Sequence, residues 1–325
     1  MTVGITCDLR SEWLAEGYSD LDTAEFDREE TLDAVDAALR AEGFATERIG
    51  SHRGLMTALS AGRRWDLVFN FCEGMYGLGR EALVPALLDA YRIPYTFSDP
   101  AVLAVTLHKG LAKRVVRDAG VRTPDFEIVE SPSDLGRVRL HYPLFAKPIA
   151  EGTGKGVTPR SRITSADELQ TVCGELLREY RQPVLVEEFL PGREFTTAII
   201  GTGAAAEAVG TMEVIMLENA EANAYTYVNK EECEERIRYE LARGPVADAC
   251  AALSVDAWRA LGCRDSGRVD LRMDARGNVS FIEANPLAGL HPKHSDLPII
   301  CTMVGISFQE LIHRIVSSAR ARAGI

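Results

Sequence analysis

Short apolar runs alternate with amphipathic stretches over the first hundred residues of the chain. The apolar runs have the length of strands, and the amphipathic stretches repeat their apolar positions with the period of a helix. The predicted order is strand 3–7, helix 24–41, strand 44–49, strand 66–72 and helix 80–91. Such an order is typical of a parallel sheet with crossover helices. We therefore predict an α/β domain over residues 1–98, which ends in the turn-rich stretch before Pro100.

After residue 98 the pattern mixes helices and strands without regular alternation, which predicts an α+β organisation. The elements predicted there are helix 99–118, strand 126–129, helix 132–138, strand 144–148, helix 166–180, strands 184–190, 194–200 and 208–216, helix 246–261 and helix 308–321. We divide this part into a central unit, 99–190, and a C-terminal unit, 191–325. The polar segment 218–235 is predicted to be a mobile loop.

Composition narrows the classes of function. The chain has 325 residues, of which 46% are hydrophobic, and a formal net charge of −12, so no nucleic-acid partner is expected. Seven cysteines without a C-x-x-C pair indicate reduced thiols rather than a disulfide framework or a zinc site. The absence of a secretory signal and of an apolar run of about eighteen residues favours a cytoplasmic protein that does not cross a membrane.

Residues 268–285 have the pattern of a β-hairpin with a turn at 275–278. If Asp274 faces Val279 across this turn, counting back gives the register of both strands. That register pairs Asp270 with Glu283 and Arg268 with Asn285 on one face. The opposite face is apolar and consists of Val269, Leu271, Met273, Ile282 and Ala284.

The polar face of this hairpin predicts a metal site. Asp270 and Glu283 would lie about 5 Å apart and would repel each other without a cation between them. With the amide oxygen of Asn285 they offer hard oxygen ligands, which Mg²⁺ or Mn²⁺ accepts more readily than zinc does. The alternative is a hairpin whose polar face only meets water.

A glycine-rich loop follows the predicted strand 144–148, which carries Lys147. The loop reads Glu151-Gly152-Thr153-Gly154-Lys155-Gly156. Glycines allow backbone N–H groups to approach phosphate oxygens, and Lys147 supplies a positive charge. The loop does not match the P-loop pattern, and a glycine-rich surface hairpin is the alternative.

Three acids, Glu187, Glu188 and Glu194, lie within or just after the predicted strand 184–190. Carboxylates beside an apolar strand can accept hydrogen bonds from adenine and ribose. The alternative is that they are edge charges that prevent aggregation. Lys109, taken alone, has the pattern of a solvated helix residue.

Taken together, these segments resemble the ATP-grasp superfamily, and most closely the D-alanine-D-alanine ligase family. The similarity runs in order over nearly the whole chain. It includes Asp66-Leu-Val-Phe, Ile93-Pro-Tyr-Thr, Thr106-Leu-His-Lys, Lys147-Pro with Glu151-Gly, Val186-Glu-Glu-Phe-Leu-Pro-Gly-Arg-Glu-Phe-Thr, Gly267-Arg-Val-Asp, Phe281-Ile-Glu-Ala-Asn-Pro, Gly289 and Val304-Gly-Ile-Ser-Phe. The resemblance implies a Rossmann-like (pre-ATP-grasp) parallel sheet followed by a two-part ATP-grasp domain.

The resemblance also implies a role for individual residues. The cofactors would be ATP and two Mg²⁺ ions, with Mn²⁺ as a substitute. ATP would be held by Lys109, Lys147, the loop residues Glu151, Gly152, Thr153 and Gly154, the adenine-binding stretch Glu187, Glu188, Phe189 and Leu190, and the ribose-binding Glu194. The metal ligands would be Asp270, Glu283 and Asn285, and the catalytic groups Lys230 at the γ-phosphate and Arg268 with the Gly289 amide at the oxyanion.

The substrate regions depart from the family pattern. The N-terminal loop motif of the family is missing, and Glu73-Gly stands where the family has His-Gly. After Gly289 the chain reads Leu-His291-Pro-Lys293-His294, and the role of these three side chains is left open. We therefore predict an ATP-dependent ligase that joins a carboxylate to an amine through an acyl phosphate, on amino-acid or peptide substrates that need not be D-alanine.

Two other functions remain alternatives at this point. An ATP-grasp kinase would use the same metal face but phosphorylate a hydroxyl, and Arg268 beside Asp270 favours the ligase over it. A nucleotide-binding regulator without chemistry would not need all three metal ligands. The resemblance further suggests a homodimer.

Overall fold

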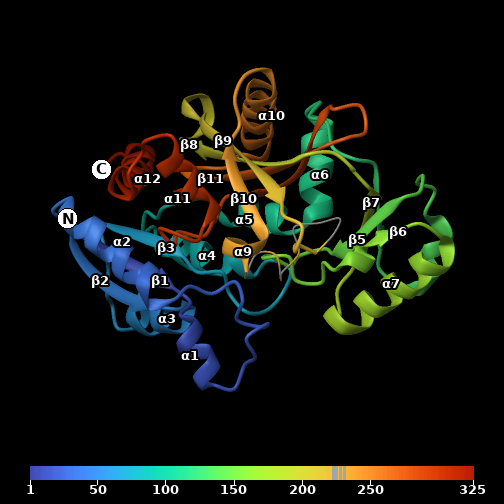
Figure 1. The fold of residues 1–325 in the computed structure, drawn as a ribbon. Helices are drawn as coiled ribbons and strands as arrows, with labels where there is room; N and C mark the ends of the chain where they lie inside the picture. The colour runs from blue at the N-terminus through green and yellow to red at the C-terminus, as the bar shows by residue number, and fades with distance from the viewer. Residues whose placement is uncertain (222–225, 227–228, 230–231) are drawn as a thin grey trace.

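The computed structural model describes residues 1–325 with the exception of 222–225, 227–228 and 230–231 (Figure 1). The described part contains a three-stranded, a four-stranded and a five-stranded sheet. The first is parallel, and the other two are antiparallel. This arrangement confirms the predicted fold class, in which a parallel sheet precedes a two-part α+β region.

The N-terminal sheet has the order β2-β1-β3. Its elements are β1 (Thr2–Cys7), α1 (Arg10–Ala15), α2 (Glu29–Ala41), β2 (Ala45–Gly50), α3 (His52–Ser60) and β3 (Leu67–Phe71). The helix predicted at 24–41 begins only at Glu29. Residues before it run alongside the loop after β1, because Asp27 N–H donates to Asp8 O and Arg10 N–H donates to Asp27 O. The prediction was wrong there, since backbone pairing with a distant segment replaces the first helical turns.

Four short helical elements connect this sheet to the rest of the molecule: η1 (Arg80–Ala82), α4 (Leu83–Ala90), α5 (Pro100–Leu107) and α6 (Lys109–Asp118). The single helical stretch predicted at 99–118 is interrupted at His108, whose ψ of 88° is not helical. The His108 ring accepts a hydrogen bond from Leu111 N–H and so caps α6. This break makes Lys109 the first residue of α6.

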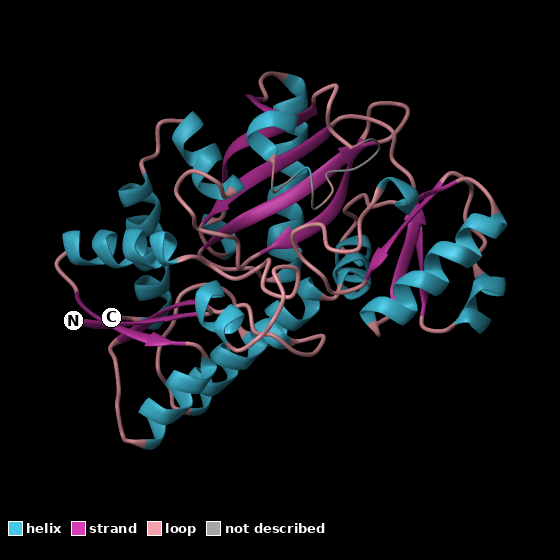
Figure 2. Cartoon of the chain, turned by 60° about the horizontal axis from the view of Figure 1, so that its bottom comes forward, coloured by secondary structure: helices cyan, strands magenta, loops and turns pink. Residues whose placement is uncertain are grey.

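The four-stranded sheet has the order β4-β7-β5-β6. Its elements are β4 (Phe126–Val129), η2 (Pro132–Arg137), β5 (Leu144–Pro148), η3 (Pro159–Ser161), β6 (Arg162–Ile163), α7 (Ala166–Tyr180) and β7 (Val184–Glu188). One apolar core joins α7 to this sheet through side chains such as Leu169, Val172 and Val186. Figure 2 shows the sheet and its helix set apart from the other two sheets.

The five-stranded sheet has the order β10-β9-β8-β11-β12 and is the centre of the molecule. Its elements are β8 (Glu194–Ile200), η4 (Gly203–Ala205), β9 (Glu207–Met216), α9 (Cys233–Arg236), β10 (Ile237–Leu241), α10 (Pro245–Leu261), β11 (Ser266–Met273), β12 (Val279–Asn285), α11 (Asp296–Met303) and α12 (Phe308–Ala323). α10 packs Trp258 against one face, together with Ala112 and Val116 of α6.

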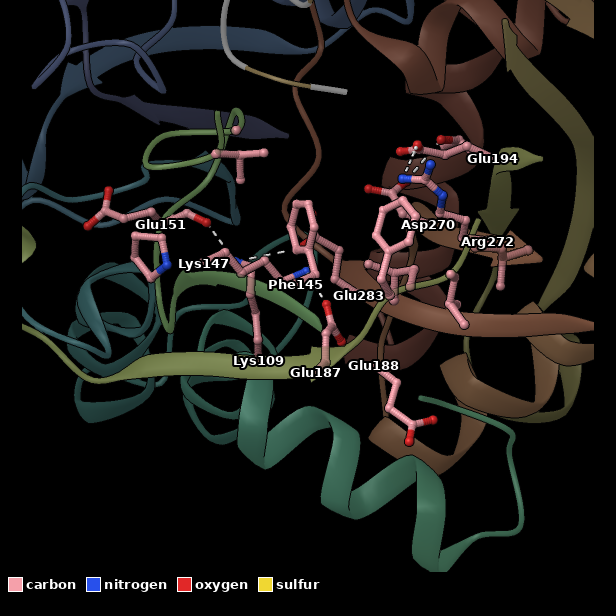
Figure 3. Close-up of a pocket in the computed structure, with 18 of the residues that line it drawn as sticks. Lys109, Phe145, Lys147, Glu151, Glu187, Glu188, Glu194, Asp270, Arg272 and Glu283 are labelled. Atoms are coloured by element: carbon pink, nitrogen blue, oxygen red, sulfur yellow. Dashed lines mark hydrogen bonds and ion pairs between the residues drawn. The ribbon is translucent and has the colours of Figure 1, made fainter. Parts of the chain in front are cut away.

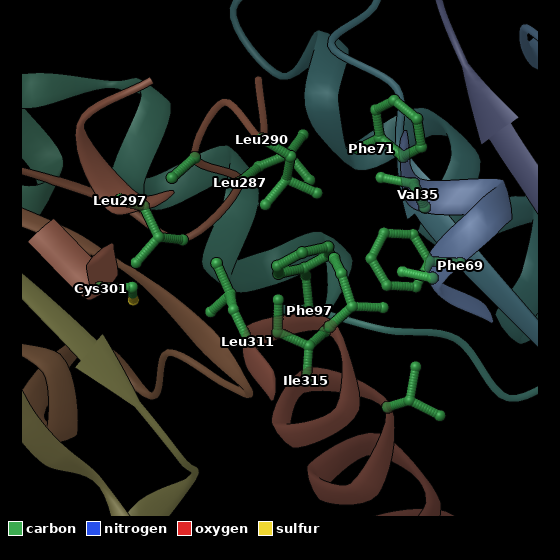
Figure 4. Close-up of a cluster of buried hydrophobic side chains, with 14 of the residues drawn as sticks. Val35, Phe69, Phe71, Phe97, Leu287, Leu290, Leu297, Cys301, Leu311 and Ile315 are labelled. Atoms are coloured by element: carbon green, nitrogen blue, oxygen red, sulfur yellow. The ribbon is translucent and has the colours of Figure 1, made fainter. Parts of the chain in front are cut away.

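The other face of this sheet belongs to a second core. Ala198 and Met212 of the sheet share that core with Leu311 of α12 and with Phe69 of the N-terminal sheet. Figure 4 shows Leu311 and Ile315 beside Phe97, with Phe69 and Val35 next to them. The C-terminal helices therefore fix the N-terminal sheet to the five-stranded sheet. The two boundaries between the three predicted domains stay a prediction.

Among the described residues, no single helix has the length and apolar character needed to cross a membrane, although the strongly bent pair α11 and α12 meets the criterion jointly.

Candidate active site

The predicted metal ligands lie on the two neighbouring strands of the β11–β12 hairpin. Asp270 pairs with Glu283, and Arg268 pairs with Asn285, which confirms the predicted pairing. Because β8 lies on the other side of β11, Thr196 faces Asp270 on the same polar face. Three neighbouring strands thus contribute oxygen-bearing side chains to one point of the sheet.

The register nearer the turn differs from the prediction. Met273, and not Asp274, faces Val279, and Leu271 faces Phe281. The shift is a β-bulge, in which one strand contributes one extra residue. Ile282 is that extra residue, and it lines the cleft beside Glu283 instead of the apolar core. Phe281 takes the core position and is fully buried.

Asp270 is surrounded by donors. Its carboxylate accepts a hydrogen bond from Thr196 Oγ1 at 3.0 Å and one from Asn285 Nδ2 at 3.3 Å, and it forms an ion pair with Arg268. Arg268 also lies 3.7 Å from Asp296 Oδ2. Burial acts to lower the pKa of Arg268, but Asp270 and Asp296 outweigh it and raise the pKa. The guanidinium therefore stays charged at the edge of the site.

A buried row of opposite charges lies across the cleft from the hairpin. Glu187 of β7 stands between two lysines, with Lys113 Nζ at 2.7 Å and Lys147 Nζ at 3.2 Å. Figure 3 shows Glu187 beside Lys147. Burial tends to raise the pKa of Glu187, but the two ammonium groups hold it below its ordinary value. Burial lowers the pKa of Lys113 to about 8. Both oxygens of Glu187 are thus engaged by lysines.

Lys113 is a residue that our reading of the sequence missed. It is fully buried in α6, where its ammonium also donates to Thr123 Oγ1 at 2.8 Å. The signal was its spacing from Lys109, because residues four apart lie on the same side of a helix. Lys109 is buried as well and donates to Glu151 O at 2.6 Å, with Glu283 Oε2 at 3.5 Å.

Lys109, Lys147, Glu187, Asp270 and Glu283 line a cleft of about 880 Å³, with the space open to solvent included, between the four-stranded and the five-stranded sheets. Its apolar part includes Phe145 and Phe189, whose rings stack with centroids 6.3 Å apart. Leu190 also lines it. Glu194 lies at the same end and pairs with Arg272 at 3.3 Å. A flat aromatic floor beside a paired carboxylate suits a nucleoside.

Glu188 contributes differently from its neighbours. Figure 3 shows its carboxylate pointing away from the other labelled side chains. Its backbone N–H donates to Asp125 O, in the segment before β4. This N–H is therefore already engaged, and the predicted contact of the Glu188 main chain with adenine stays a prediction.

The glycine-rich loop 151–156 is held over the cleft by buried ion pairs. Lys155 Nζ lies 2.5 Å from Glu25 Oε1 and 2.6 Å from Glu151 Oε2. Arg80 binds Glu25 at 2.7 Å and also donates to Ala150 O at 2.7 Å. Despite burial, Arg80 and Lys155 lower the pKa of Glu25 to about 2.

Close packing explains one glycine of this loop. A Cβ atom at Gly152 would come within 2.5 Å of the Glu25 carboxylate. Thr153 and Gly154 next to it have positive φ angles of 49° and 76°. Our reading of the sequence missed Glu25 because it placed residues 24–41 in one helix. Lys230, the other predicted lysine, lies outside the described residues.

Comparison with known proteins decides the family. The family model described as D-ala D-ala ligase C-terminus matches residues 115–317, which is more than half of the chain. The chain belongs to the D-alanine-D-alanine ligase family. It is therefore an ATP-grasp ligase that forms C–N bonds.

Individual relatives agree with this assignment. A D-alanine–D-alanine ligase of Bordetella petrii is 34% identical over 262 residues, which cover 79% of this chain and 77% of that protein. An uncharacterized protein of Sinorhizobium fredii is 32% identical over 311 residues, with 89% of this chain and 87% of that protein covered.

Solved structures show the same fold. The D-alanine–D-alanine ligase from Bacillus anthracis complexed with ATP superposes with a TM-score of 0.76 at 19% identity, and covers 100% of this chain and 98% of its own. A D-Ala:D-Ser ligase from Enterococcus faecalis has a TM-score of 0.75 at 17% identity, with coverages of 98% and 99%.

A second cavity, of about 660 Å³ with the space open to solvent included, extends from Lys109 to Gly289. Arg268 and Asn285 line it, and so do Glu73 and Glu81. Burial, and to a lesser extent the Glu81 carboxylate, raises the pKa of Glu73 well above its ordinary value. Burial also raises the pKa of Glu81 to about 7.

A third, larger cavity adjoins the second and is open to solvent. Gly289, Arg268, His291 and His294 line it, and the two histidine rings lie with centroids 4.6 Å apart. Burial and then His294 lower the pKa of His291. Lys293, which the sequence grouped with these histidines, is exposed.

Proposed function

We propose that this ligase joins the carboxylate of one amino acid or peptide to the amine of a second, through an acyl phosphate, with a substrate pair other than two D-alanines. The observation that carries the proposal is the Asp270–Glu283 pair facing Lys109 and Arg268 at the junction of two cavities. One cavity suits a nucleotide, and the other is lined by Glu73, which stands where the family pattern has a histidine.

The residues present fit divalent cations. Asp270 and Glu283 offer carboxylate oxygens, and the Asn285 side chain offers an amide oxygen once its amide group turns. These three would hold two Mg²⁺ ions, or Mn²⁺ in their place. Bound metal would neutralise charge on the triphosphate oxygens. Every other part of the chemistry falls to side chains and backbone groups of the chain.

In the first step, an oxygen of the substrate carboxylate attacks the γ-phosphorus of ATP, and the bond from that phosphorus to the β-phosphate oxygen breaks. The products are an acyl phosphate and ADP. Lys147 and Lys109 place positive charge beside the phosphates, and the loop 151–156 covers them. We assign Lys230 to the γ-phosphate from the family pattern alone.

In the second step, the neutral amine attacks the acyl carbon, the bond from this carbon to the phosphate oxygen breaks, and inorganic phosphate leaves with its electron pair. The attacking nitrogen loses one proton as the amide forms. The tetrahedral oxyanion between these events would lie near Arg268 and the Gly289 amide, which line the same cavity.

ADP release, measured over a grid of carboxylic acids and amines with Mg²⁺, tests this function. Hydroxylamine in place of the amine should trap the acyl phosphate as a hydroxamate. If only hydroxyl acceptors support ADP release and no hydroxamate forms with any acid, the protein is a kinase and the proposal is wrong.

A cytoplasmic location and a homodimer stay predictions. The six described cysteines at positions 7, 72, 173, 250, 263 and 301 are all free and buried, as reduced thiols would be. Sedimentation at several protein concentrations checks the dimer.

A further inference from the structure

Lys113 is a buried charge behind the cleft that suits a nucleoside, and no step of the proposed chemistry uses it. Its side chain has no exposed surface, so a bound nucleotide cannot touch it. The ammonium faces three acceptors, which are Glu187 Oε2 at 2.7 Å, Thr123 Oγ1 at 2.8 Å and the Phe281 carbonyl oxygen at 3.5 Å. A protonated lysine has three N–H bonds. These contacts therefore match the charged form of Lys113.

The contacts of Lys113 reach both walls of the cleft. Glu187 belongs to β7 of the four-stranded sheet, and Phe281 belongs to β12 of the five-stranded sheet. Phe281 N–H donates to Arg122 O at 2.8 Å, and Thr123 Oγ1 donates to Phe281 O at 2.9 Å. The segment before β4 thus holds this point of β12 by two hydrogen bonds. Lys113 ties Glu187 to a fixed point of the opposite wall.

Glu187 is the group through which Lys113 can act on a ligand. Its side chain lines the cleft although the residue is only 3% exposed. Burial opposes the charge of Glu187, and Lys113, followed by Lys147, holds its pKa below the ordinary value. An ionised carboxylate accepts hydrogen bonds and donates none. A molecule in the cleft therefore meets a hydrogen-bond acceptor at Glu187.

We propose that Lys113 is a positioning residue for the nucleotide, because it holds Glu187 as a fixed acceptor and so makes the cleft prefer a base with an amino group to one with a carbonyl oxygen at the same position. This inference rests on the proposed function, which places a nucleotide in the cleft. The amino group of adenine offers N–H donors to Glu187, whereas the carbonyl oxygen of hypoxanthine only accepts. Lys113 acts on this choice without touching the base.

Binding of ADP and IDP tests the inference. IDP differs from ADP by a carbonyl oxygen in place of the amino group of the base, with a proton on the adjacent ring nitrogen. Titration calorimetry with Mg²⁺ gives the Kd of each nucleotide without any acid or amine. The wild type should bind ADP about 10- to 100-fold more tightly, since IDP exchanges a charge-assisted hydrogen bond for two opposed acceptors. Equal affinities in the wild type would overturn the inference.

The variant Lys113→Met removes the charge behind Glu187. Glu187 can then take up a proton and donate to the carbonyl oxygen of IDP, so the preference for ADP should fall to about threefold or less. If this variant does not fold, Lys113→Gln replaces it, because its amide still donates to Glu187 without a charge. A merely structural role of Lys113 would weaken both nucleotides alike and leave the ratio of their Kd values unchanged, which would overturn the inference.

Lys155→Met is the matched control. Lys155 lines the same cleft, but it pairs with Glu25 and Glu151 and not with Glu187. Its removal should change the affinities for ADP and IDP by the same factor. A loss of the preference in this control as large as that in Lys113→Met would show that any lost lysine has this effect, and the inference would be wrong.

A double-mutant cycle shows whether Lys113 acts through Glu187. Glu187→Gln removes the charge of the acceptor and should itself reduce the preference for ADP. Adding Lys113→Met to this variant should then change the ratio of the two Kd values by less than about twofold. A further change as large as that caused by Lys113→Met alone would show that Lys113 acts by another route.

Failure of the proposed function gives a different result. A kinase or a regulator that binds ATP would form no hydroxamate from any acid, but it would still prefer ADP and lose the preference in Lys113→Met. If instead hydroxamate forms while the preference is absent or insensitive to Lys113→Met, the ligase chemistry stands and the role of Lys113 is refuted.

Discussion

The two adjoining cavities, which we propose to be the nucleotide end and the substrate end of one cleft, handle buried charge in opposite ways. At the nucleotide end, buried acids have cations within reach, as Glu187 does with Lys113 and Lys147. Glu194 pairs there with Arg272. At the substrate end, within the residues that the structure describes, Glu73 and Glu81 line the cavity with no cation bound to them.

The difference separates two physical tasks. A paired set of charges is complete before the nucleotide arrives, so it can hold its geometry and lower the reorganisation needed for phosphoryl transfer. Unpaired acids raise the free energy of the folded protein, because burial opposes their ionisation. We infer that the nucleotide end supplies the activation chemistry common to the family and that the substrate end selects the acid.

The largest effect should come from the metal face at the junction of the two ends. Replacing Asp270 by Asn removes a negative charge that the two proposed metal ions would need, and turnover measured by ADP release should fall about 10³-fold. Asp274→Asn, at the turn of the same hairpin, is the control, because its backbone contacts to Arg276 and Asn278 can be kept by an amide oxygen. Asp270→Asn with turnover near that of the wild type would exclude Asp270 from the metal site.

The paired end should respond strongly in stability. Lys113→Met leaves Glu187 buried with one lysine, and the free energy of unfolding should fall by about 3 kcal/mol. Chemical denaturation measures it. Glu175→Gln breaks an exposed pair with Arg160 and should change stability by less than about 1 kcal/mol. Equal losses in the two variants would show that burial does not distinguish these pairs.

Removing an acid from the unpaired end should raise the free energy of unfolding, whereas Lys113→Met lowers it. Burial raises the pKa of Glu81 to about 7. Between about pH 4.5 and pH 7 Glu81 therefore ionises in the unfolded chain but stays protonated in the folded one, so the free energy of unfolding of the wild type falls as the pH rises through this window. Glu81→Gln lacks this group. Its advantage over the wild type should be near zero below pH 4.5, grow through that window and level off at about 1–3 kcal/mol above pH 7. A difference that does not vary with pH would mean that Glu81 ionises in the folded protein as it does in water.

The pairing of Asp270 with Glu283 was predicted from the sequence, but the bulge and the length of the turn were not. The Asp270–Glu283 register followed from strict alternation counted back from a turn. The bulge at Ile282 was not predicted. The turn has one residue more than predicted and the bulge adds one residue to β12, so a count that ignores both still pairs Asp270 with Glu283. Periodicity carries no mark of one extra residue.

The sequence also did not predict which charged side chains are buried in ion pairs. The spacing of Lys113 from Lys109 places both on one side of a helix, but only the three-dimensional structure brings Glu187 to Lys113. Glu25 was assigned to a helix because its segment has helical periodicity, whereas pairing of Asp27 with residues 8 and 10 extends that segment. Contacts between residues far apart in sequence decide both cases, and local patterns do not contain them.

The smallest effect should come from the glycine-rich loop that connects the two ends. Lys155 ties this loop to Glu25, yet its removal orphans no acid, because Glu25 keeps Arg80 and Glu151 keeps Gln182. Lys155→Met should therefore leave stability within about 1 kcal/mol and raise the KM for ATP about three- to tenfold, as expected for one lost charge-assisted contact. Lys155→Arg keeps the charge and should restore most of the affinity. If Lys155→Met instead raised the KM for the amino acid and left the KM for ATP unchanged, the loop would belong to the substrate end. The paired charges of the nucleotide end would then stop at Glu151 and would not include Glu25.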